Sequence, residues 1–308
     1  MTSPLQPELV GRPYAPAECV VEQTQIDRAK TALAYVAPAT LDDTVVPGFC
    51  EHYRSWIQST KLNTVTGLDQ FPVTAFSQGT TEAFDNFYIR NHNRRFRVFR
   101  GEYIYHRRIW QQHYINQWAY LDDDSLAVGD AVIVSWPFAD TGNKHQQLSN
   151  EFLDQCHDMG IPVLIDAAFF GVCANQDFNF SHPAIQEVVF SLSKSFPVSN
   201  LRIGIRFAKQ DFEDGMQIYH GTQYVNKLSA GIGLYLMSFR GPDEAYSLWR
   251  ERQQDFCNQL GLELSDTVLF GIDTNHRYDH YNRGSVNTNR LCFSRYYESG
   301  KLVPDVQS

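Results

Sequence analysis

The chain has 308 residues, of which 43% are apolar and 20% charged, so it is long enough for a full hydrophobic core and belongs to neither the disordered nor the fibrous class. Its formal net charge of −9 excludes a general nucleic-acid binder, because neutralising phosphates requires a basic surface. The sequence shows no apolar run of about eighteen residues and no basic, apolar leader, so we expect no membrane partner and a cytoplasmic location.

The first predicted elements are an arm and a helix. Residues 1–43 are rich in Pro, Ala and Thr with little periodicity, which predicts an extended N-terminal arm and linker rather than part of the core. From Thr44 to about Lys61, apolar residues recur at helical spacing and predict the first core helix.

Short apolar runs then alternate with longer helical patterns. The predicted strands lie at 71–76, 96–99, 131–136, 163–166 and 188–193, and the predicted helices lie near 81–91, 146–159, 222–239 and 243–260. This alternation predicts an α/β fold with a mainly parallel sheet and helices on both faces. We therefore expect a large domain at 44–210 and a small C-terminal α+β domain at 211–308, with a further strand at 290–294.

Neither the basic cluster of the chain nor its cysteines and histidines predict a binding site. Seven arginines lie between residues 90 and 108, and we interpret this segment as a solvated helix end that runs into a strand. The six cysteines are scattered without CxxC pairs, which predicts neither a zinc site nor a disulfide framework. His276 and His280 have the spacing of a metal pair, but they lie in a loop-like segment, so we expect no metal site.

Ligands of an open parallel sheet gather at the carboxyl ends of its strands, so the residues that follow the predicted strands are the candidates for a site. Gly79, Thr80 and Thr81 follow the first predicted strand and open the next helix. Free backbone N–H groups and the positive end of the helix dipole favour a phosphate there. The same residues are also typical of an ordinary helix N-cap.

Two charged side chains follow the later strands. Asp166 closes a short apolar strand and needs a cationic or hydrogen-bonding partner to offset its desolvation, although it is equally typical of a cap for a following helix. Lys194 follows another such strand, and a partly desolvated lysine can be a nucleophilic amine that forms a Schiff base. Ser191, Ser193 and Arg202 stand close to it in the sequence and suit a phosphate dianion.

With these motifs in this order, residues from about 70 to 295 resemble the fold-type I enzymes that depend on pyridoxal 5′-phosphate (PLP), specifically the class I/II, aspartate aminotransferase-like family. The resemblance implies a seven-stranded sheet of the PLP-dependent transferase fold, PLP as the cofactor, and a homodimer. It implies phosphate binding by Gly79, Thr80, Thr81, Ser191 and Arg202 with Ser193 beside them, ring stacking by Tyr103, ring-nitrogen binding by Asp166, the Schiff base on Lys194 and substrate α-carboxylate binding by Arg290.

The sequence departs from this family at two positions. Ala139 stands where the family has an asparagine that donates to the cofactor's 3-oxygen, and Phe169 stands where it has a tyrosine with the same role. Trp136 and Asn143 are the candidates to replace these donors. The departures leave the type of reaction open more than the cofactor.

Three functions are compatible with these residues. The leading one is an aminotransferase for an amino acid and a keto acid, in which Lys194 is the general base and Asp166 keeps the ring nitrogen protonated. The second is another PLP reaction on an amino acid, such as decarboxylation, elimination or cyclisation in a biosynthetic pathway. The third is a non-catalytic protein with the same fold, against which the intact Lys194, Asp166 and Arg202 argue. The sequence names neither the amino donor nor the acceptor.

Overall fold

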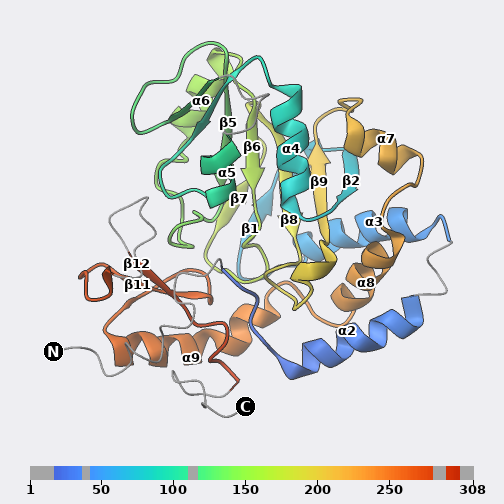
Figure 1. Cartoon of the computed structure of the whole chain (residues 1–308), viewed down its shortest axis with the longest axis vertical. Coiled ribbons are helices and arrows are strands. Elements are labelled where there is room, and N and C mark those ends of the chain that lie inside the picture. Colours follow the sequence, from blue (N-terminus) through green and yellow to red (C-terminus); the bar gives the residue numbers. More distant parts are fainter. Residues whose placement is uncertain (1–16, 37–41, 110–116, 280–288, 299–308) are drawn as a thin grey trace.

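A seven-stranded, mostly parallel sheet forms the centre of the protein, as Figure 1 shows for the computed structural model. The structure describes residues 17–36, 42–109, 117–279 and 289–298. In sheet order the strands are β2 (Val73–Ser77), β9 (Gly204–Ala208), β8 (Ile185–Ser191), β6 (Val163–Asp166), β5 (Asp130–Ser135), β3 (Arg95–Val98) and β4 (Gln117–Tyr120). The strands from β8 to β4 run parallel, whereas β9 runs antiparallel to β8 and β2. The predicted mainly parallel α/β sheet is therefore confirmed.

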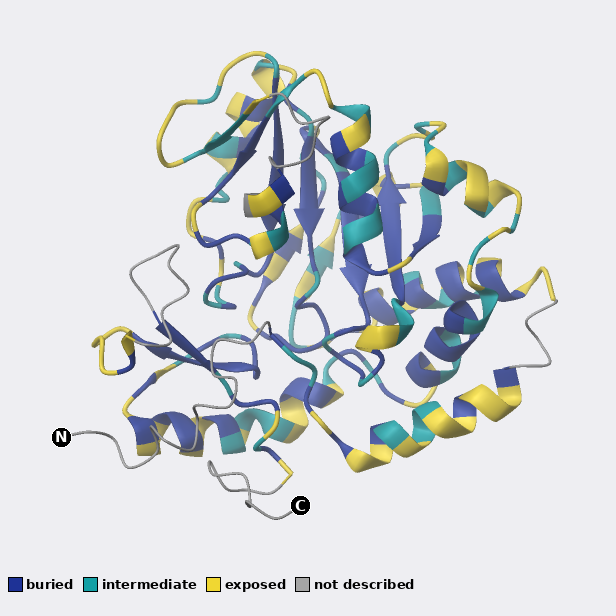
Figure 2. Ribbon diagram, viewed as in Figure 1, coloured by how far each residue is buried: buried dark blue, intermediate teal, exposed yellow. Residues whose placement is uncertain are grey.

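Helices cover both faces because alternate residues of the central strands point to opposite sides. On one face, Ala131 and Ile133 of β5 pack in a cluster with α4 (Thr80–Arg90) and α7 (Gly215–Gly221). On the other face, Val132 and Val134 pack in a cluster with α3 (Val45–Gln58), α6 (Asn150–Asp158) and α8 (Lys227–Met237). Figure 2 shows the sheet as a buried layer between these helices. None of the helices in the described ranges is long and apolar enough to cross a membrane.

The C-terminal part of the chain forms a second, smaller unit beside the carboxyl ends of the parallel strands (Figure 1). Here α9 (Glu244–Leu260) lies with a three-stranded antiparallel sheet of β10 (Glu263–Leu264), β11 (Phe270–Asp273) and β12 (Asn289–Cys292). Phe256 of α9 packs edge-on against Phe293, with ring centroids 5.5 Å apart. The predicted small C-terminal α+β unit is therefore present.

The remaining elements are short. The strands β1 (Thr64–Thr66) and β7 (Asp177–Asn179) pair in parallel, and α5 (Ile104–Arg108) follows β3. Two 3-10 turns, η2 (Leu68–Gln70) and η4 (Ser199–Leu201), complete the described part of the chain together with α2 (Gln23–Val36).

Helix α2 corrects one prediction. The expected extended conformation of the arm is wrong for Gln23–Val36, where good helix formers such as Ala29, Lys30 and Ala32 outweigh the weak periodicity. The helix packs against α8 so closely that a Cβ on Gly231 would lie 2.3 Å from a methyl of Val36. Helices α7 and α8 follow residue 210 and yet pack on β2 and α3. The domain boundaries given above stay a prediction.

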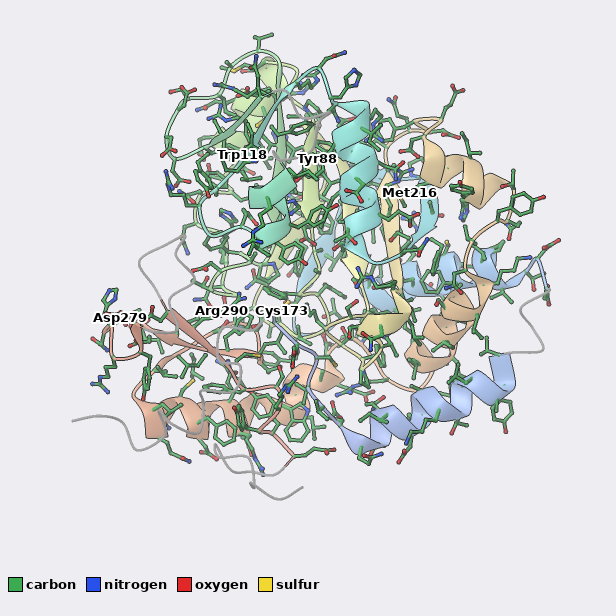
Figure 3. The ribbon with its side chains drawn as sticks, in the orientation of Figure 1. Tyr88, Trp118, Cys173, Met216, Asp279 and Arg290 are labelled. Carbon is green, nitrogen blue, oxygen red and sulfur yellow. The ribbon has the colours of Figure 1, made fainter. Side chains whose placement is uncertain are left out.

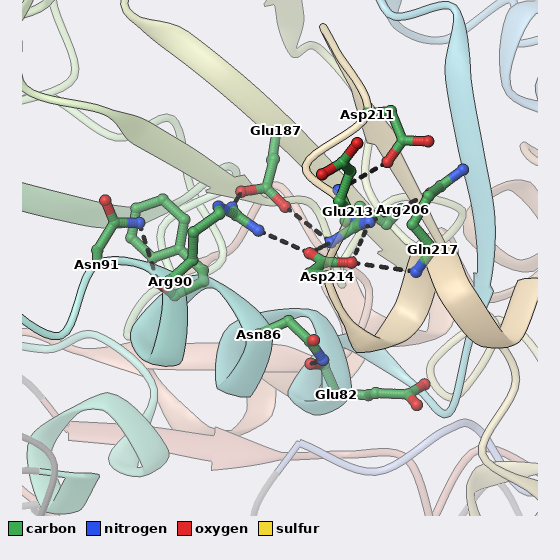
Figure 4. Close-up of polar contacts among 11 residues, drawn as sticks. Glu82, Asn86, Arg90, Asn91, Glu187, Arg206, Asp211, Glu213, Asp214 and Gln217 are labelled. Carbon is green, nitrogen blue, oxygen red and sulfur yellow. Dashed lines mark hydrogen bonds and ion pairs between the residues drawn. The ribbon is translucent and has the colours of Figure 1, made fainter.

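A buried ion-pair network joins the amino-terminal half of β8 to its neighbours (Figure 4). Arg206 of β9 lies 3.4 Å from Glu187 and also binds Asp214, and Arg90 of α4 binds both carboxylates, with Asp214 at 2.7 Å. Both Glu187 and Arg206 are almost fully buried. The charged Arg206 interrupts the apolar pattern of β9, which explains why the sequence did not predict this strand.

The basic segment is only partly solvated. Arg97 of β3 is 0% exposed and donates to Asp130 of β5 at 2.6 Å. The prediction of a helix end running into a strand is correct for Arg90 and Arg95, but solvation is wrong for Arg97. The reason is the neighbouring strand, which supplies a carboxylate that the sequence alone does not place there.

Candidate functional site

One cavity of about 110 Å³ lies at the carboxyl ends of the parallel strands, where the small C-terminal unit meets the sheet. Every predicted site residue except Gly79 lines it. The lining residues are Ala17, Thr80, Thr81, Tyr103, Ser135, Pro137, Ala139, Asp166, Ala168, Phe169, Ser191, Ser193, Lys194, Arg202 and Arg290. Residues that are far apart along the chain, from Ala17 to Arg290, thus meet at the position that the topology favours for a ligand.

Gly79, Thr81 and Arg202 build one end of the cavity. Gly79 is the N-cap of α4 with φ 71°, and no side chain caps this helix end. Nη2 of Arg202 donates to Oγ1 of Thr81 at 3.1 Å, so the guanidinium lies over the first turn of α4. A Cβ on residue 79 would lie 2.1 Å from the same Nη2 atom. The site therefore needs glycine at this position, and it combines a helix N-terminus with an arginine, which suits a phosphate.

Two serines at the end of β8 add hydroxyl groups to this end. The Oγ atoms of Ser191 and Ser193 lie 2.8 Å apart, and the backbone N–H of Ser193 donates to Oγ of Ser191 at 3.2 Å. Both side chains line the cavity with Arg202. These groups together can donate several hydrogen bonds to a dianion.

Asp166 lies deeper, at the end of β6. It is 5% exposed, and Oδ1 accepts a hydrogen bond from the backbone N–H of Ala168 at 3.0 Å. Burial, and secondarily the negative charge of Glu102, raises the pKa of Asp166 to about 7. A turn follows rather than a helix, so the interpretation as a helix cap is wrong. A carboxyl group in this environment gains from a cationic ligand, which would restore its ionised form.

Lys194 lies in the turn after β8, within the same cavity. Burial lowers the pKa of its amine, and the nearby Arg290 contributes in the same direction. Nζ donates a hydrogen bond to the backbone carbonyl of Ala17 in the N-terminal segment. A lysine with a depressed pKa carries more of the neutral, nucleophilic amine at neutral pH than a surface lysine does.

Arg290 reaches the cavity from β12 of the small unit. In Figure 3, the labelled Arg290 lies where the small C-terminal unit meets the large sheet. Its guanidinium donates to the carbonyls of Ala139 and Asp140, the latter at 3.0 Å, and lies 4.1 Å from the ring centroid of Phe270. The side chain is 5% exposed and borders the cavity.

Tyr103 closes another side of the cavity and is held by its neighbours. Its ring stacks with Tyr105 at 6.2 Å and 15°, and Tyr105 donates a hydrogen bond to Asp85. His106 packs against the edge of Tyr103 and lies 2.6 Å from the hydroxyl of Tyr88. Burial lowers the pKa of His106 to about 4, so this histidine is neutral at physiological pH.

The two departures from the family pattern both border the cavity, since Ala139 and Phe169 are lining residues. Neither of the candidate replacements does. Trp136 packs against Phe178 at 5.5 Å, and Oδ1 of Asn143 accepts a hydrogen bond from the backbone N–H of Asp266 at 2.7 Å. The hydroxyl at this wall belongs to Ser135 instead, which the sequence analysis did not select.

The thiols and histidines outside the cavity form no site in the described ranges. All six cysteines are free thiols. Those ranges contain no group of three metal-ligating side chains close enough to hold an ion. His280 lies outside them, so the absence of a metal site at His276 and His280 stays a prediction.

Comparisons with known proteins support the fold. No protein family and no curated protein matches the sequence. Among solved structures, a PLP-bound C-S lyase from Staphylococcus hominis has a TM-score of 0.65 at 11% identity, covering 93% of this chain and 88% of that one. An aspartate aminotransferase double mutant from Thermus thermophilus has a TM-score of 0.66 at 12% identity, covering 92% and 87%.

A putative aminotransferase from Silicibacter pomeroyi has a TM-score of 0.66 at 13% identity, covering 96% of this chain and 91% of that one. These proteins span nearly the whole chain, so the likeness is not confined to the sheet. Because a lyase and aminotransferases are alike at this level, the comparison establishes a fold and not a reaction. The chain has the fold of these aminotransferases and of the PLP-bound lyase.

Proposed function

We propose that the protein is a PLP-dependent enzyme that acts on an amino acid, and that it is an aminotransferase with a keto acid as the second substrate. One observation carries the proposal. A single cavity brings together a buried amine (Lys194), a buried carboxyl group that needs a cation (Asp166), a glycine-bounded helix N-terminus and two arginines. PLP has the complementary groups, namely an aldehyde carbon that reacts with an amine, a basic ring nitrogen and a phosphate.

The residues present fit this cofactor. Arg202, Ser191, Ser193 and the first turn of α4 would hold the phosphate, and Gly79 leaves the room that this arrangement needs. Asp166 would pair with the protonated ring nitrogen, which would lower its raised pKa.

Tyr103 would lie against the ring, since stacking with Tyr105 holds it at the cavity wall. Lys194 would hold the cofactor covalently through its ε-amine. These assignments agree with the roles that the sequence resemblance implies.

The bound cofactor supplies an electron sink for charge that develops at the substrate's Cα. The chain supplies the remaining chemistry. Once the amino group of the substrate has taken its place, the Lys194 amine would take the proton from Cα and deliver it to the former aldehyde carbon of the cofactor, for which its lowered pKa is suited. Arg290 binds the α-carboxylate of the amino acid and so orients Cα toward Lys194. Asp166 keeps a proton on the ring nitrogen throughout.

The proposal predicts a yellow protein after incubation with PLP. Borohydride should fix the cofactor on the peptide that contains Lys194, as mass spectrometry would show. Lys194→Ala protein is the control, and equal labelling of this variant would refute the assignment. A panel of amino acids with 2-oxo acids, with product analysis by chromatography, then identifies the reaction.

The same panel separates the alternatives. Ala139 and Phe169 remove both side-chain donors that the family places near the 3-oxygen, and this observation favours a test for lyase and decarboxylase products in parallel. Release of ammonia or carbon dioxide without transfer of the amino group would indicate a lyase or a decarboxylase. Covalent binding of PLP with no product from any amino acid would indicate a non-catalytic protein.

We also propose a cytoplasmic homodimer. The free state of all six cysteines supports a reducing compartment. The exposed large apolar side chains include three on α2 and shortly after α8 (Leu33, Tyr35, Phe239) and three on and after α7 (Ile218, Tyr219, Tyr224). Surfaces of this kind favour burial against a second copy. A monomeric mass by light scattering, with full PLP occupancy, would contradict the dimer.

A further inference from the structure

A buried carboxylate, Glu102, lies behind the wall of the cavity, and the proposed function gives it no role. The side chain is 0% exposed. Oε1 accepts a hydrogen bond from the backbone N–H of Ser135 at 3.0 Å and lies 3.2 Å from Nε2 of His145, and Oε2 accepts from the hydroxyl of Ser135 at 2.5 Å. Burial of a carboxylate costs several kcal/mol unless such donors surround it.

The hydrogen bonds of Ser135 continue toward the substrate site. Its Oγ accepts a hydrogen bond from the backbone N–H of Ala139 at 2.7 Å, and the carbonyl of Ala139 accepts one from Nη1 of Arg290. A hydroxyl has one proton, and the Ala139 N–H is a donor, so the Ser135 proton goes to Glu102. Glu102 therefore takes the Ser135 proton, which leaves a lone pair of Oγ facing the Ala139 N–H.

Position 139 makes this backbone link necessary. Because its side chain is a methyl group, Ala139 offers Arg290 only its carbonyl. On the other side of its Cα, the N–H of the same residue is held by Ser135, which restrains the backbone that carries this carbonyl. A second carbonyl, that of Asp140, lies 3.0 Å from the same Nη1 atom, so the backbone of residues 139 and 140 holds the guanidinium at two points.

His145 fixes Glu102 from the opposite side. Its ring lies between those of Phe99 and Phe138, with centroids 4.9 Å and 4.4 Å away. Nδ1 is buried and has no hydrogen-bond partner in the described part of the chain. Within the described part of the chain, the ring of His145 therefore makes its polar contact with Glu102. The ring also contacts Phe138, the residue that precedes Ala139.

We infer that Glu102 is a positioning residue for substrate binding, which acts through Ser135 and the Ala139 peptide to orient Arg290 toward the α-carboxylate. The inference rests on the proposed function, because it concerns the substrate of the same site. Glu102 is not among the residues that line the cavity, and only its charge reaches the cofactor end, through Asp166. Its removal therefore affects the affinity for a carboxylate more than it affects the binding of PLP.

The test uses the PLP-loaded protein with two isosteric or smaller changes, Glu102→Gln and Ser135→Ala. The probes are the amino acid that reacts fastest in the panel above and its α-carboxamide, which lacks the charged group. Each variant should raise the KM for the amino acid about tenfold, the effect of one lost hydrogen bond to a charged group, and leave the KM for the carboxamide within about twofold. Ser135→Thr, which keeps a hydroxyl, should restore most of the affinity.

A double-mutant cycle shows whether the effect passes through Arg290. In an Arg290→Lys background, Ser135→Ala should add almost nothing to the KM, since the residue through which it acts is gone. Titration of acetate into the PLP-loaded protein, followed by absorbance, gives a second measure of carboxylate affinity that needs no turnover. The PLP dissociation constant of Glu102→Gln should stay within about threefold of the original value.

Two results would overturn the inference. One is an equal rise in KM for the amino acid and the carboxamide, which would indicate a general structural role for Glu102. The other is full additivity with Arg290→Lys. A failure of the proposed function looks different, because in that case the unsubstituted protein itself would bind no PLP or convert no amino acid.

Discussion

Substitution of Gly79 by alanine tests the phosphate end of the cavity most directly. Residue 79 has φ 71° and ψ −177°, a backbone conformation that is nearly restricted to glycine. The added methyl carbon would lie 2.1 Å from Nη2 and 2.7 Å from Cζ of Arg202. These distances are far below van der Waals contact, so the guanidinium has to shift from its position over the first turn of α4.

Two costs follow from this geometry. The backbone strain lowers the free energy of unfolding by about 1–3 kcal/mol. Displacement of Arg202 removes a hydrogen bond between charged groups from the bound phosphate, worth about 1.5–3 kcal/mol, so PLP should bind about tenfold to a hundredfold more weakly. The loss of unfolding free energy is measurable in the cofactor-free protein, whereas the loss of the hydrogen bond changes only the affinity for PLP.

Urea unfolding and PLP titration separate the two effects. Gly160→Ala is the matched control, because residue 160 has φ 64° and a Cβ there meets nothing within 4 Å. The control should lose about 1 kcal/mol of stability and keep its PLP affinity. An unchanged affinity for PLP in Gly79→Ala would show that Arg202 does not hold the phosphate and would refute the assignment of this end of the cavity.

Three further predictions concern other parts of the molecule. The pKa of Asp166 is about 7 in the fold against 3.8 as its ordinary value, so the folded state binds more protons between these values; the stability of the cofactor-free protein should fall as the pH rises from about 4 to 7, and Asp166→Asn should abolish that fall in urea titrations. Arg290→Lys should raise the KM for the amino acid at least tenfold and leave PLP binding intact, because an ammonium group cannot form a bidentate pair; unchanged kinetics would remove Arg290 from the site. Glu187→Gln should destabilise the protein by about 3 kcal/mol in urea, since it leaves buried Arg206 with less charge compensation, and should not alter PLP affinity.

The most specific signal for the site in the sequence comes from residues that are close together along the chain. Four such residues lie within twelve positions of the sequence, and all four line the cavity (Ser191, Ser193, Lys194 and Arg202). The central strands β5, β6 and β8 were predicted because strands that are buried on both faces form continuous apolar runs. Strand β9 escaped prediction because it carries a buried arginine whose partners come from other elements.

Some contacts that the fold makes between distant positions could not be predicted, because the two partners form no motif together. Glu102 and His145 are 43 residues apart, and neither forms a motif with the other. Ala17 reaches Lys194 from 177 residues away and contributes only a backbone carbonyl, which leaves no signal in the sequence. A buried polar side chain needs a hydrogen-bond or charge partner, but the sequence does not say which residue will be that partner.

The arginines of β9 and of the turn before it show how the fold separates stabilising charges from those that can bind a ligand. Arg206 is 1% exposed and has two carboxylates as partners, so its charge is compensated within the protein. Arg202, four residues earlier, donates to a hydroxyl of Thr81 and a carbonyl of Ser199, which are neutral groups. Lys194 likewise donates to a carbonyl. Positive charge that is bound to neutral acceptors beside a cavity retains its attraction for an anion, whereas positive charge in an ion pair does not. The cavity end of the sheet is therefore the end at which an anionic cofactor gains most from binding.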